Sequence, residues 1–318
     1  MFAKRLLPLV CALGLAGCTS SVPVDSEVSA TPSLRAVELG PKMLHEKKLA
    51  FLDTCEEWDE WDKPSPPFQI MGDSFYVGTC GISAILVTSA EGHVLLDSGV
   101  PAAAPLVLAN IRELGFDPKD VRYILMSHEH FDHVGAHGAL ADATGAQVVA
   151  SPRAKDVLES GRVAADDPQA ASDHPNMTPV KVDRVMTDGE ALRVGDREFT
   201  AHLTPGHSPG AMSWTWASCS LPFEPPVCRT IAYVDSLSPV SSDGYRFSDH
   251  PQYLAAFRDS IDKARFLHCD FIVTPHPSAS GMIEGMKDDS YYESGPCQRY
   301  ADALSEKLDV RVAKEAAE

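Results

Sequence analysis

Residues 127–133, with the sequence Ser-His-Glu-His-Phe-Asp-His, place three histidines and an aspartate close together in the chain. The apolar run at residues 123–126 comes directly before them and predicts a buried strand. Because side chains alternate along an extended chain, we expect His128 and His130 to point the same way where this strand ends. Imidazole and carboxylate groups are ligands that zinc takes. The segment therefore predicts a metal site, and it requires a fold in which a buried strand ends at that site.

Two further histidines follow predicted strands elsewhere in the chain. His207 lies in the loop Thr-Pro-Gly-His-Ser-Pro-Gly at residues 204–210, after a strand-like run. His276 lies in Thr-Pro-His-Pro at residues 274–277, after another apolar run. A single histidine is more often packed or solvent-facing than a ligand. Three histidine sites at the carboxyl ends of strands are a stronger indication, because ligand sites in such sheets collect there.

These motifs, together with the strand-like residues 231–238, resemble the metallo-β-lactamase superfamily. The intact H-x-H-x-D-H, the final His276, and Ser236 in place of a cysteine ligand resemble its subclass B3 in particular. The resemblance runs from about Trp58 to the C-terminus. It implies an α/β fold, a four-layer αββα sandwich of the metallo-β-lactamase type. Alternating predicted strands and helices in two strand-rich blocks fit the same architecture.

The resemblance also implies the chemistry of the site. It implies two Zn²⁺ ions per chain, the first held by His128, His130 and His207 and the second by Asp132, His133 and His276. Zinc lowers the pKa of bound water to about 7, and Asp132 would also act in catalysis by orienting that nucleophile. Ser236 and Ser238 would bind the substrate carboxylate. The implied reaction is hydrolysis of the β-lactam ring of antibiotics, including carbapenems, which confers resistance.

Two features allow more than one interpretation. Asp97 follows an apolar run, where its carboxylate would either accept a ligand imidazole N–H or form a turn before Ser98 and Gly99. Trp61 would flank the pocket from the N-terminal loop, or Trp58 and Trp61 would pack in the core or against a disulfide. The residues alone leave both questions open.

The N-terminal residues resemble an export signal. Lys4 and Arg5 precede an apolar stretch too short for a stable membrane anchor. Residues 15–18, Leu-Ala-Gly-Cys, resemble a bacterial lipoprotein cleavage box, with ordinary secretory cleavage as the alternative. The expected segments are a signal peptide at 1–17, a tether and N-terminal segment at 18–50, and the metallo-β-lactamase domain at 51–318. The mature protein would lie in the periplasm, attached to the outer membrane through a lipidated Cys18.

The net charge weighs against one class of binding partner, and the cysteine content indicates the redox state of the compartment. The formal net charge of −18 argues against nucleic-acid binding, which needs clustered lysine and arginine. Apart from Cys11 and Cys18, the cysteines form an even set, which predicts disulfides in an oxidising compartment but does not choose the pairing. The family resemblance favours Cys55–Cys80, Cys219–Cys228 and Cys269–Cys297. We expect a small-molecule β-lactam as the binding partner and favour a monomer.

The remaining patterns predict the order of the elements. Strands are expected at residues 68–70, 74–77, 82–88, 93–96 and 148–150, and helices near 41–49 and at 104–114, 134–144, 251–266 and 297–314. A helix beginning at Val134 would let Asp132 and His133 face a second ion. Residues 164–177 are polar and predict a surface loop near the mouth of the site.

Two other functions compete with lactam hydrolysis. A thioester hydrolase of the glyoxalase II type, or a lactonase, would share the fold, with Asp235 bridging the metals. The export signal, the cysteines and the Ser-Leu-Ser at residues 236–238 favour the lactamase instead. An exported zinc-binding lipoprotein without catalysis would favour closed four-ligand sites without Asp132, whereas this ligand set leaves open positions. Hydrolysis of β-lactams is the leading hypothesis.

Overall fold

The computed structural model describes residues 40–220 and 226–317, all of them within one unit that spans residues 34–318. The expected signal peptide, Cys18 and residues 18–39 of the expected tether lie outside the described residues. The expected end of the tether at residue 50 falls inside helix α1, Pro41–Thr54. Among the described residues, no helix is both long and apolar enough to span a bilayer.

The first sheet is built from strands that follow one another in chain order. Its strands are β1 (Phe68–Met71), β2 (Ser74–Tyr76), β3 (Ile85–Val87), β4 (His93–Leu96), β5 (Val121–Leu125), β6 (Gln147–Ala150) and β7 (Arg184–Val185). Neighbours from β1 to β4 pair antiparallel, and those from β4 to β7 pair parallel. Ile85 and Val87 face one hydrophobic core, and Leu86 between them faces another. This sheet is therefore buried on both faces, as continuous apolar strands predict.

The second sheet has the strand order β12-β11-β10-β9-β8. Its strands are β8 (Ala191–Val194), β9 (Arg197–Leu203), β10 (Met212–Ser220), β11 (Val227–Tyr233) and β12 (Phe271–Val273). β11 and β12 pair parallel, and the other neighbours pair antiparallel. Trp214 and Tyr233 belong to the same core as Ile85 and Leu96 of the first sheet. The two sheets therefore pack face to face through these side chains.

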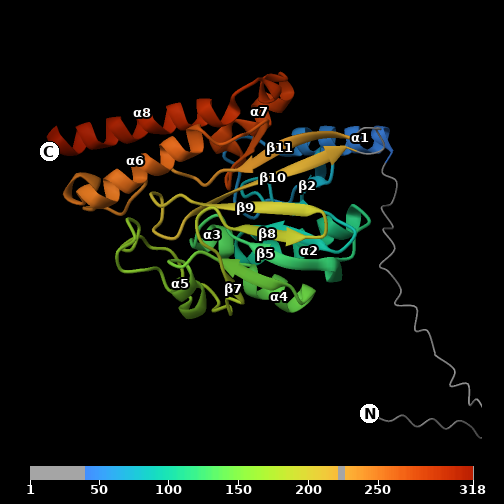
Figure 1. The fold of residues 1–318 in the computed structure, drawn as a ribbon, viewed down its shortest axis with the longest axis horizontal. Helices are drawn as coiled ribbons and strands as arrows, with labels where there is room; N and C mark the ends of the chain where they lie inside the picture. Colours follow the sequence, from blue (N-terminus) through green and yellow to red (C-terminus); the bar gives the residue numbers. More distant parts are fainter. Residues whose placement is uncertain (1–39, 221–225, 318) are drawn as a thin grey trace, which may run out of the picture. The chain divides into compact units, whose positions relative to one another are not determined.

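Helices cover the outer faces of the two sheets (Figure 1). They are α1, α2 (Ala104–Glu113), α3 (Phe131–Val134), α4 (His137–Thr144), α5 (Lys155–Ser160), α6 (Pro251–Arg265), α7 (Met282–Lys287) and α8 (Pro296–Ala317), with 3-10 turns at Pro101–Ala103, Pro118–Asp120, Phe247–Asp249, Pro277–Ser280 and Ser290–Tyr292. Val107 of α2 and Leu140 of α4 pack on the first sheet. Phe257 of α6 and Leu304 of α8 belong to the core of the second. The predicted four-layer αββα sandwich is confirmed.

Most predicted elements lie where the sequence placed them, but the helix expected at residues 134–144 was wrong in its start and its continuity. It begins at Phe131 as α3, breaks after Val134, and resumes as α4. At the break, the N–H of Ala136 donates to the carbonyl oxygen of Gly99 rather than within the helix. A Cβ on Gly135 would lie 2.4 Å from the Phe131 carbonyl oxygen, so only glycine fits this close approach.

The cysteines predicted to form disulfides meet in three pairs within the described residues. The S–S distances are 1.97 Å for Cys55–Cys80, 2.07 Å for Cys219–Cys228 and 2.10 Å for Cys269–Cys297. This is the pairing that the family resemblance implied. The first pair joins the end of α1 to the segment between β2 and β3, beside the loop that carries Trp58.

Candidate metal centre

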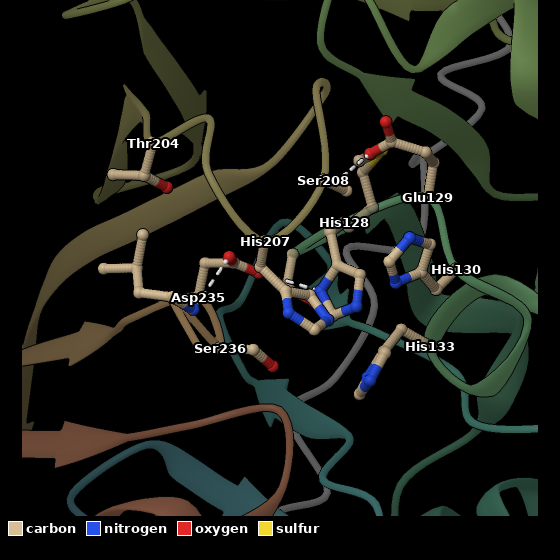
Figure 2. Close-up of polar contacts among 12 residues, drawn as sticks. His128, Glu129, His130, His133, Thr204, His207, Ser208, Asp235 and Ser236 are labelled. Atoms are coloured by element: carbon tan, nitrogen blue, oxygen red, sulfur yellow. Dashed lines mark hydrogen bonds and ion pairs between the residues drawn. The ribbon is translucent and has the colours of Figure 1, made fainter. Parts of the chain in front are cut away.

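Loops that follow separate strands bring the predicted ligands together (Figure 2). His128 and His130 follow β5, and His207 follows β9. One ring nitrogen of each lies within 4.8 Å of the other two, and all three side chains are buried. We call these residues the first ligand set. They converge on one point, as the sequence predicted.

Each ring of the first set is held at its second nitrogen by a partner outside the set. Nδ1 of His128 lies 2.8 Å from Oδ1 of Asp235, and Nε2 of His130 lies 3.0 Å from Oδ2 of Asp167. Nδ1 of His207 lies 3.0 Å from a backbone carbonyl oxygen. A partner on the outer nitrogen fixes the orientation of an imidazole. The other nitrogen of His128 has no hydrogen-bond partner among the described residues, whereas that of His207 lies 3.3 Å from Nε2 of Gln169.

The second ligand set consists of Asp132, His133 and His276, and it is organised around the carboxylate. Oδ2 of Asp132 lies 3.0 Å from Nε2 of His133 and 3.3 Å from Nε2 of His276. Nδ1 of His133 lies 3.5 Å from a carboxylate oxygen of Asp97. The two sets adjoin, since ligand atoms of Asp132 and His133 lie within 4.8 Å of one on His128.

The ligand histidines differ in pKa according to their neighbours. Burial and the neighbouring His133 hold the pKa of His128 well below its usual range, and burial lowers the pKa of His207 to about 3. Burial also opposes a charge on His133, but the Asp132 carboxylate outweighs it and raises the pKa of His133 to about 10. Burial likewise opposes ionisation of Asp132, and His133 nevertheless holds the pKa of this carboxyl well below its usual range. His128 and His207 therefore favour the neutral form. In the same set, burial opposes a charge on His130, but the Asp167 carboxylate outweighs it and raises the pKa of His130. The second set contains the Asp132–His133 ion pair.

The chemistry of these residues fits a metal ion. Nε2 of His128 is buried and has no hydrogen-bond partner among the described residues. Buried polar atoms are rarely left without a partner, and a metal ion would occupy this lone pair. Imidazoles with a single carboxylate are a common ligand choice for zinc, and three protein ligands leave a position open for water or substrate.

Comparison with known proteins agrees with this geometry. The family model of the metallo-beta-lactamase superfamily matches residues 77–221. The solved structure of the MIM-2 metallo-beta-lactamase is 44% identical, covers 85% of this chain and 98% of its own, and has a TM-score of 0.80. The chain belongs to the metallo-beta-lactamase superfamily.

Two other solved structures extend the likeness within this superfamily. The metallo-beta-lactamase MIM-1 from Novosphingobium pentaromativorans is 47% identical, covers 84% of this chain and 98% of its own, and has a TM-score of 0.80. MEM-A1, a subclass B3 metallo-beta-lactamase from a soil metagenome library, is 37% identical, covers 81% of this chain and 99% of its own, and has a TM-score of 0.76. The resemblance to subclass B3 is confirmed across most of the chain.

The curated relatives in this superfamily match over shorter lengths. An N-acyl homoserine lactonase from Agrobacterium fabrum is 29% identical over 52% of this chain and 62% of the relative. A hydroxyacylglutathione hydrolase from Cereibacter sphaeroides is 29% identical over 44% of this chain and 45% of the relative. The chain spans about half the length of the curated relatives it matches.

In this superfamily member, Glu129 has a role that the motif did not reveal. It is the variable residue of H-x-H and is buried. Its Oε2 accepts a hydrogen bond from the Ser208 hydroxyl at 2.7 Å, and its Oε1 accepts one from the Gly210 N–H at 2.7 Å (Figure 2). A Cβ on Gly210 would lie 2.7 Å from Oε2 of Glu129, so this approach requires glycine. Glu129 thereby fastens the His207 loop to the segment that carries His128.

The loop at residues 164–177 was expected at the surface, but two of its side chains are buried in the metallo-beta-lactamase site. Asp167 contacts His130, and Nε2 of Gln169 lies 3.3 Å from Nε2 of His207. Sequence reasoning missed both residues, because aspartate and glutamine in a polar loop are ordinarily solvated. Only their contacts with His130 and His207 in the folded structure identify them as residues of the site.

Asp97 lies beside a predicted ligand, and no turn is assigned at residues 97–99. Its backbone has a φ of 57°, in the left-handed region. Its buried carboxylate accepts hydrogen bonds from the N–H and the hydroxyl of Ser127, both at 2.6 Å, and from the Tyr233 hydroxyl at 2.8 Å. The same carboxylate lies beside His133. Of the two interpretations, the structure favours the one in which Asp97 supports a ligand of the second set.

The two serines predicted to bind substrate differ in their surroundings. Oγ of Ser236 is buried and has no hydrogen-bond partner among the described residues. Oγ of Ser238 lies 3.1 Å from Nδ1 of His207, and its carbonyl oxygen is the partner of that nitrogen at 3.0 Å. The Ser236 hydroxyl is therefore unpaired within the described residues but buried, whereas Ser238 contacts a histidine of the first ligand set. A direct contact of either serine with substrate stays a prediction.

Proposed function

We propose that this protein hydrolyses the β-lactam ring of antibiotics, with two zinc ions held by the two ligand sets. The observation that carries the proposal is the joint presence of both sets, adjoining and complete, in a chain that aligns with nearly the full length of solved metallo-beta-lactamases. The range of substrates that we expect includes carbapenems.

The first ligand set supplies preorganised donors. His128 and His207 have a depressed pKa, so they need not release a proton near neutral pH before they bind a metal. Zinc, when bound, supplies Lewis-acid activation of a water and of the substrate carbonyl group. The outer partners of the histidines fix where that chemistry takes place.

Asp132 has two roles in this proposal. It is the anionic ligand of the second set, and its carboxylate accepts a hydrogen bond from a water that attacks the lactam carbonyl carbon. Its depressed pKa keeps the carboxylate ionised throughout the neutral range. A carboxylate close to the attacking water orients the oxygen lone pair toward the substrate. Asp132 is thus the residue that we expect to act in catalysis.

We propose the Ser236 hydroxyl, which has no hydrogen-bond partner among the described residues, as a donor to the substrate carboxylate. β-Lactam antibiotics carry a carboxylate near the ring, and a buried donor without a partner is suited to bind it. The backbone carbonyl oxygen of Ser236 accepts a hydrogen bond from the Tyr300 hydroxyl at 2.6 Å. This bond holds the serine in place, and the hydroxyl of Ser238 would add a second contact by turning away from His207.

The alternative thioester or lactone hydrolase required Asp235 to bridge the metals. Oδ1 of Asp235 lies 2.8 Å from Nδ1 of His128, and its Oδ2 accepts the N–H of Leu237 at 3.3 Å. Both oxygens are therefore engaged on the outer side of the first set, which weighs against a bridging role. Because a lactonase and a hydroxyacylglutathione hydrolase are among the curated relatives, the test below includes a thioester as its control substrate.

We also propose that the protein is exported to the periplasm and anchored to the outer membrane through lipidated Cys18. Two observations support this proposal. The basic residues Lys4 and Arg5 precede an apolar stretch, and six cysteines lie in three close pairs. Mass spectrometry of the exported protein tests it, since the mature N-terminus should be Cys18 carrying a lipid. A mature N-terminus at another residue, or an unmodified Cys18, would contradict the lipid anchor.

The deciding experiment measures hydrolysis of a carbapenem and of a chromogenic cephalosporin by the mature protein, before and after chelation. S-lactoylglutathione serves as the control substrate. We expect ring opening that a chelator abolishes and that added zinc restores. A folded, zinc-loaded protein that opens neither ring would overturn the proposal. Cleavage of the thioester alone would then support the alternative, and inactivity on all three substrates would support a binding lipoprotein.

A further inference from the structure

His276 has the most exposed side chain of the second ligand set. It is 19% exposed, whereas Asp132 is 10% exposed and His133 is fully buried. Its ring contacts the Asp132 carboxylate, and the exposed rings of Trp58 and Trp61 lie 6.3 Å and 6.1 Å away between centroids. Trp61 therefore flanks the site, as one sequence-based interpretation predicted, and the interpretation in which both tryptophans pack in the core is wrong. With so little packed around the ring, the backbone beside His276 has to hold it in place.

A residue of the first sheet binds the backbone directly before His276. Ser83 lies between β2 and β3 and is fully buried. Its N–H donates to the carbonyl oxygen of Pro275 at 2.8 Å, and its hydroxyl donates to that of Thr274 at 2.8 Å, 191 positions away in the chain. The segment that it binds follows β12, which lies at the edge of the second sheet. Ser83 therefore joins the His276 loop to the opposite sheet.

Thr274 extends this support to His276 itself. Its buried hydroxyl donates to the carbonyl oxygen of His276 at 2.6 Å and lies 2.9 Å from the Ser280 hydroxyl. The carbonyl groups of residues 274, 275 and 276 therefore accept hydrogen bonds from Ser83, Ser83 and Thr274 in turn. Three consecutive backbone groups around the ligand are fixed by two buried side chains and one N–H.

The turn that carries Ser83 is itself tightly closed. A Cβ on Gly78 would lie 2.4 Å from the carbonyl oxygen of Ile82, so the two sides of the turn touch. The pair Cys55–Cys80 joins the middle of the turn to the end of α1. Ser83 is therefore a preorganised support, and a ligand that it holds has little freedom to lose when a metal binds.

We propose that Ser83 is a positioning residue that sets the zinc affinity of the second ligand set through the backbone of His276. This inference rests on the proposed function, which places a zinc ion at that set. Zinc–imidazole bonds have a narrow range of lengths, so a small displacement of the loop weakens the bond. Ser83 supports His276 through the backbone, whereas Asp167 supports His130 through the ring.

The test measures the zinc affinity of each ligand set in the wild-type protein and in Ser83→Ala, by competition with a chromophoric chelator. His276→Ala, which lacks a ligand of the second set, identifies the binding step that belongs to that set. In Ser83→Ala we expect the affinity of the second set to fall about three- to thirtyfold, less than the loss of a direct partner would cause. The affinity of the first set should change by less than about twofold, since the ring partners of that set are unaltered. Excess zinc should restore carbapenem hydrolysis, because the ligands are unchanged.

Two further variants separate positioning from stability. Ser74→Ala removes a buried hydroxyl that accepts the indole N–H of Trp216 at 2.9 Å, so it should lower Tm but leave both zinc affinities unchanged. Thr274→Val removes the hydroxyl that donates to the His276 carbonyl oxygen, and it should weaken the second set alone. Combined with Ser83→Ala, it should cost less than the sum of the two effects, since both act on the same loop.

The outcomes distinguish the inference from the proposed function. If Ser83→Ala and Thr274→Val both bind zinc at the second set as tightly as the wild-type protein does, the inference fails and the proposed function stands. A similar loss of affinity in Ser74→Ala would also overturn the inference, because the effect would then follow stability rather than position. If the wild-type protein binds no second zinc ion, the proposed two-zinc site fails and the inference falls with it.

Discussion

Each histidine of the first ligand set contacts a group outside the set through one ring nitrogen. The histidines of the second set contact chiefly Asp132, which is itself a member of that set. Asp235 and Asp167 contact the outer nitrogens of His128 and His130 at 2.8 Å and 3.0 Å. In the second set, Asp132 contacts both histidines directly, and the outer support of His133 is a 3.5 Å approach to Asp97.

This difference suggests that one fold can prepare two neighbouring sets of candidate metal ligands in different ways. Outer partners fix the rings of the first set before a metal arrives, so little order has to be created on binding. In the first set, only His130, whose pKa Asp167 raises, would have to release a proton, and its contact with Asp167 lies on the nitrogen outside the set. The second set must exchange the Asp132–His133 ion pair between two of its own ligands for contacts with a metal, which reduces the net gain. We therefore expect the first set to bind zinc more tightly than the second.

The largest expected effect comes from removing the anion of the second set. In Asp132→Asn we expect zinc content to fall from two ions per chain to one, because a neutral amide is a weaker ligand. We expect kcat/KM for a carbapenem to fall at least about a hundredfold. Metal analysis after dialysis and initial-rate measurements check both outcomes. Asp142→Asn, at an exposed position of α4, is the matched control. Retention of two tightly bound ions by Asp132→Asn would show that the second set does not depend on the carboxylate.

The next effect tests the outer support of the first set. Asp167→Asn replaces the carboxylate beside His130, and we expect zinc affinity at this set to fall about ten- to a hundredfold. Competition with a chromophoric chelator measures the affinity. Asp166→Asn is the control, since the adjacent Asp166 is exposed and pairs with Arg153 instead. Equal affinities in the two variants would show that the partner behind His130 is unimportant.

A smaller effect is expected from Tyr233, which supports the second set indirectly through Asp97. Tyr233→Phe removes the hydroxyl that donates to Asp97 at 2.8 Å and leaves a buried carboxylate with one bond fewer. We expect the free energy of unfolding to fall by about 1–3 kcal/mol and zinc affinity of the second set to fall more than that of the first. Denaturant titration and the chelator competition measure these. Tyr291→Phe removes another buried hydroxyl, which donates to the Ile272 carbonyl oxygen, and should change stability alone. A similar loss of zinc in both variants would contradict the link to Asp97.

The smallest effect is a pH dependence of stability that comes from Glu315, which belongs to neither ligand set. Burial opposes ionisation of Glu315, but the N–H of Ser248 and the Arg311 guanidinium outweigh it and lower the pKa of Glu315 to about 2. A depressed pKa stabilises the fold above the unfolded value of about 4.3, and this contribution disappears as the pH falls toward 2. Glu315→Gln should therefore lower Tm by a few degrees at pH 7 and by progressively less below pH 4. Thermal melts across this range check the trend, and an equal loss of Tm at every pH would contradict it.

The candidate ligands could be proposed from the sequence because each is part of a short motif after a strand, and the structure brings them close together. The paired spacing of His128 and His130 depends only on the alternation of an extended chain, which is a local property. The break between α3 and α4 was not predictable in this way. It depends on the close approach of Gly135 to Pro101, whose Cδ would lie 2.7 Å from an added Cβ.

The sequence by itself determined which residues can bind a metal and where strands bring them to the edges of the sheets, because these follow from side-chain chemistry and local periodicity. Only the tertiary structure decided which partners hold those ligands. Asp167, Asp235 and Glu129 lie far along the chain from the groups they contact, or are single residues without a motif. A carboxylate in a polar loop has the same local pattern whether it faces water or a buried imidazole. The two cases differ only once tertiary packing brings the carboxylate and the imidazole together.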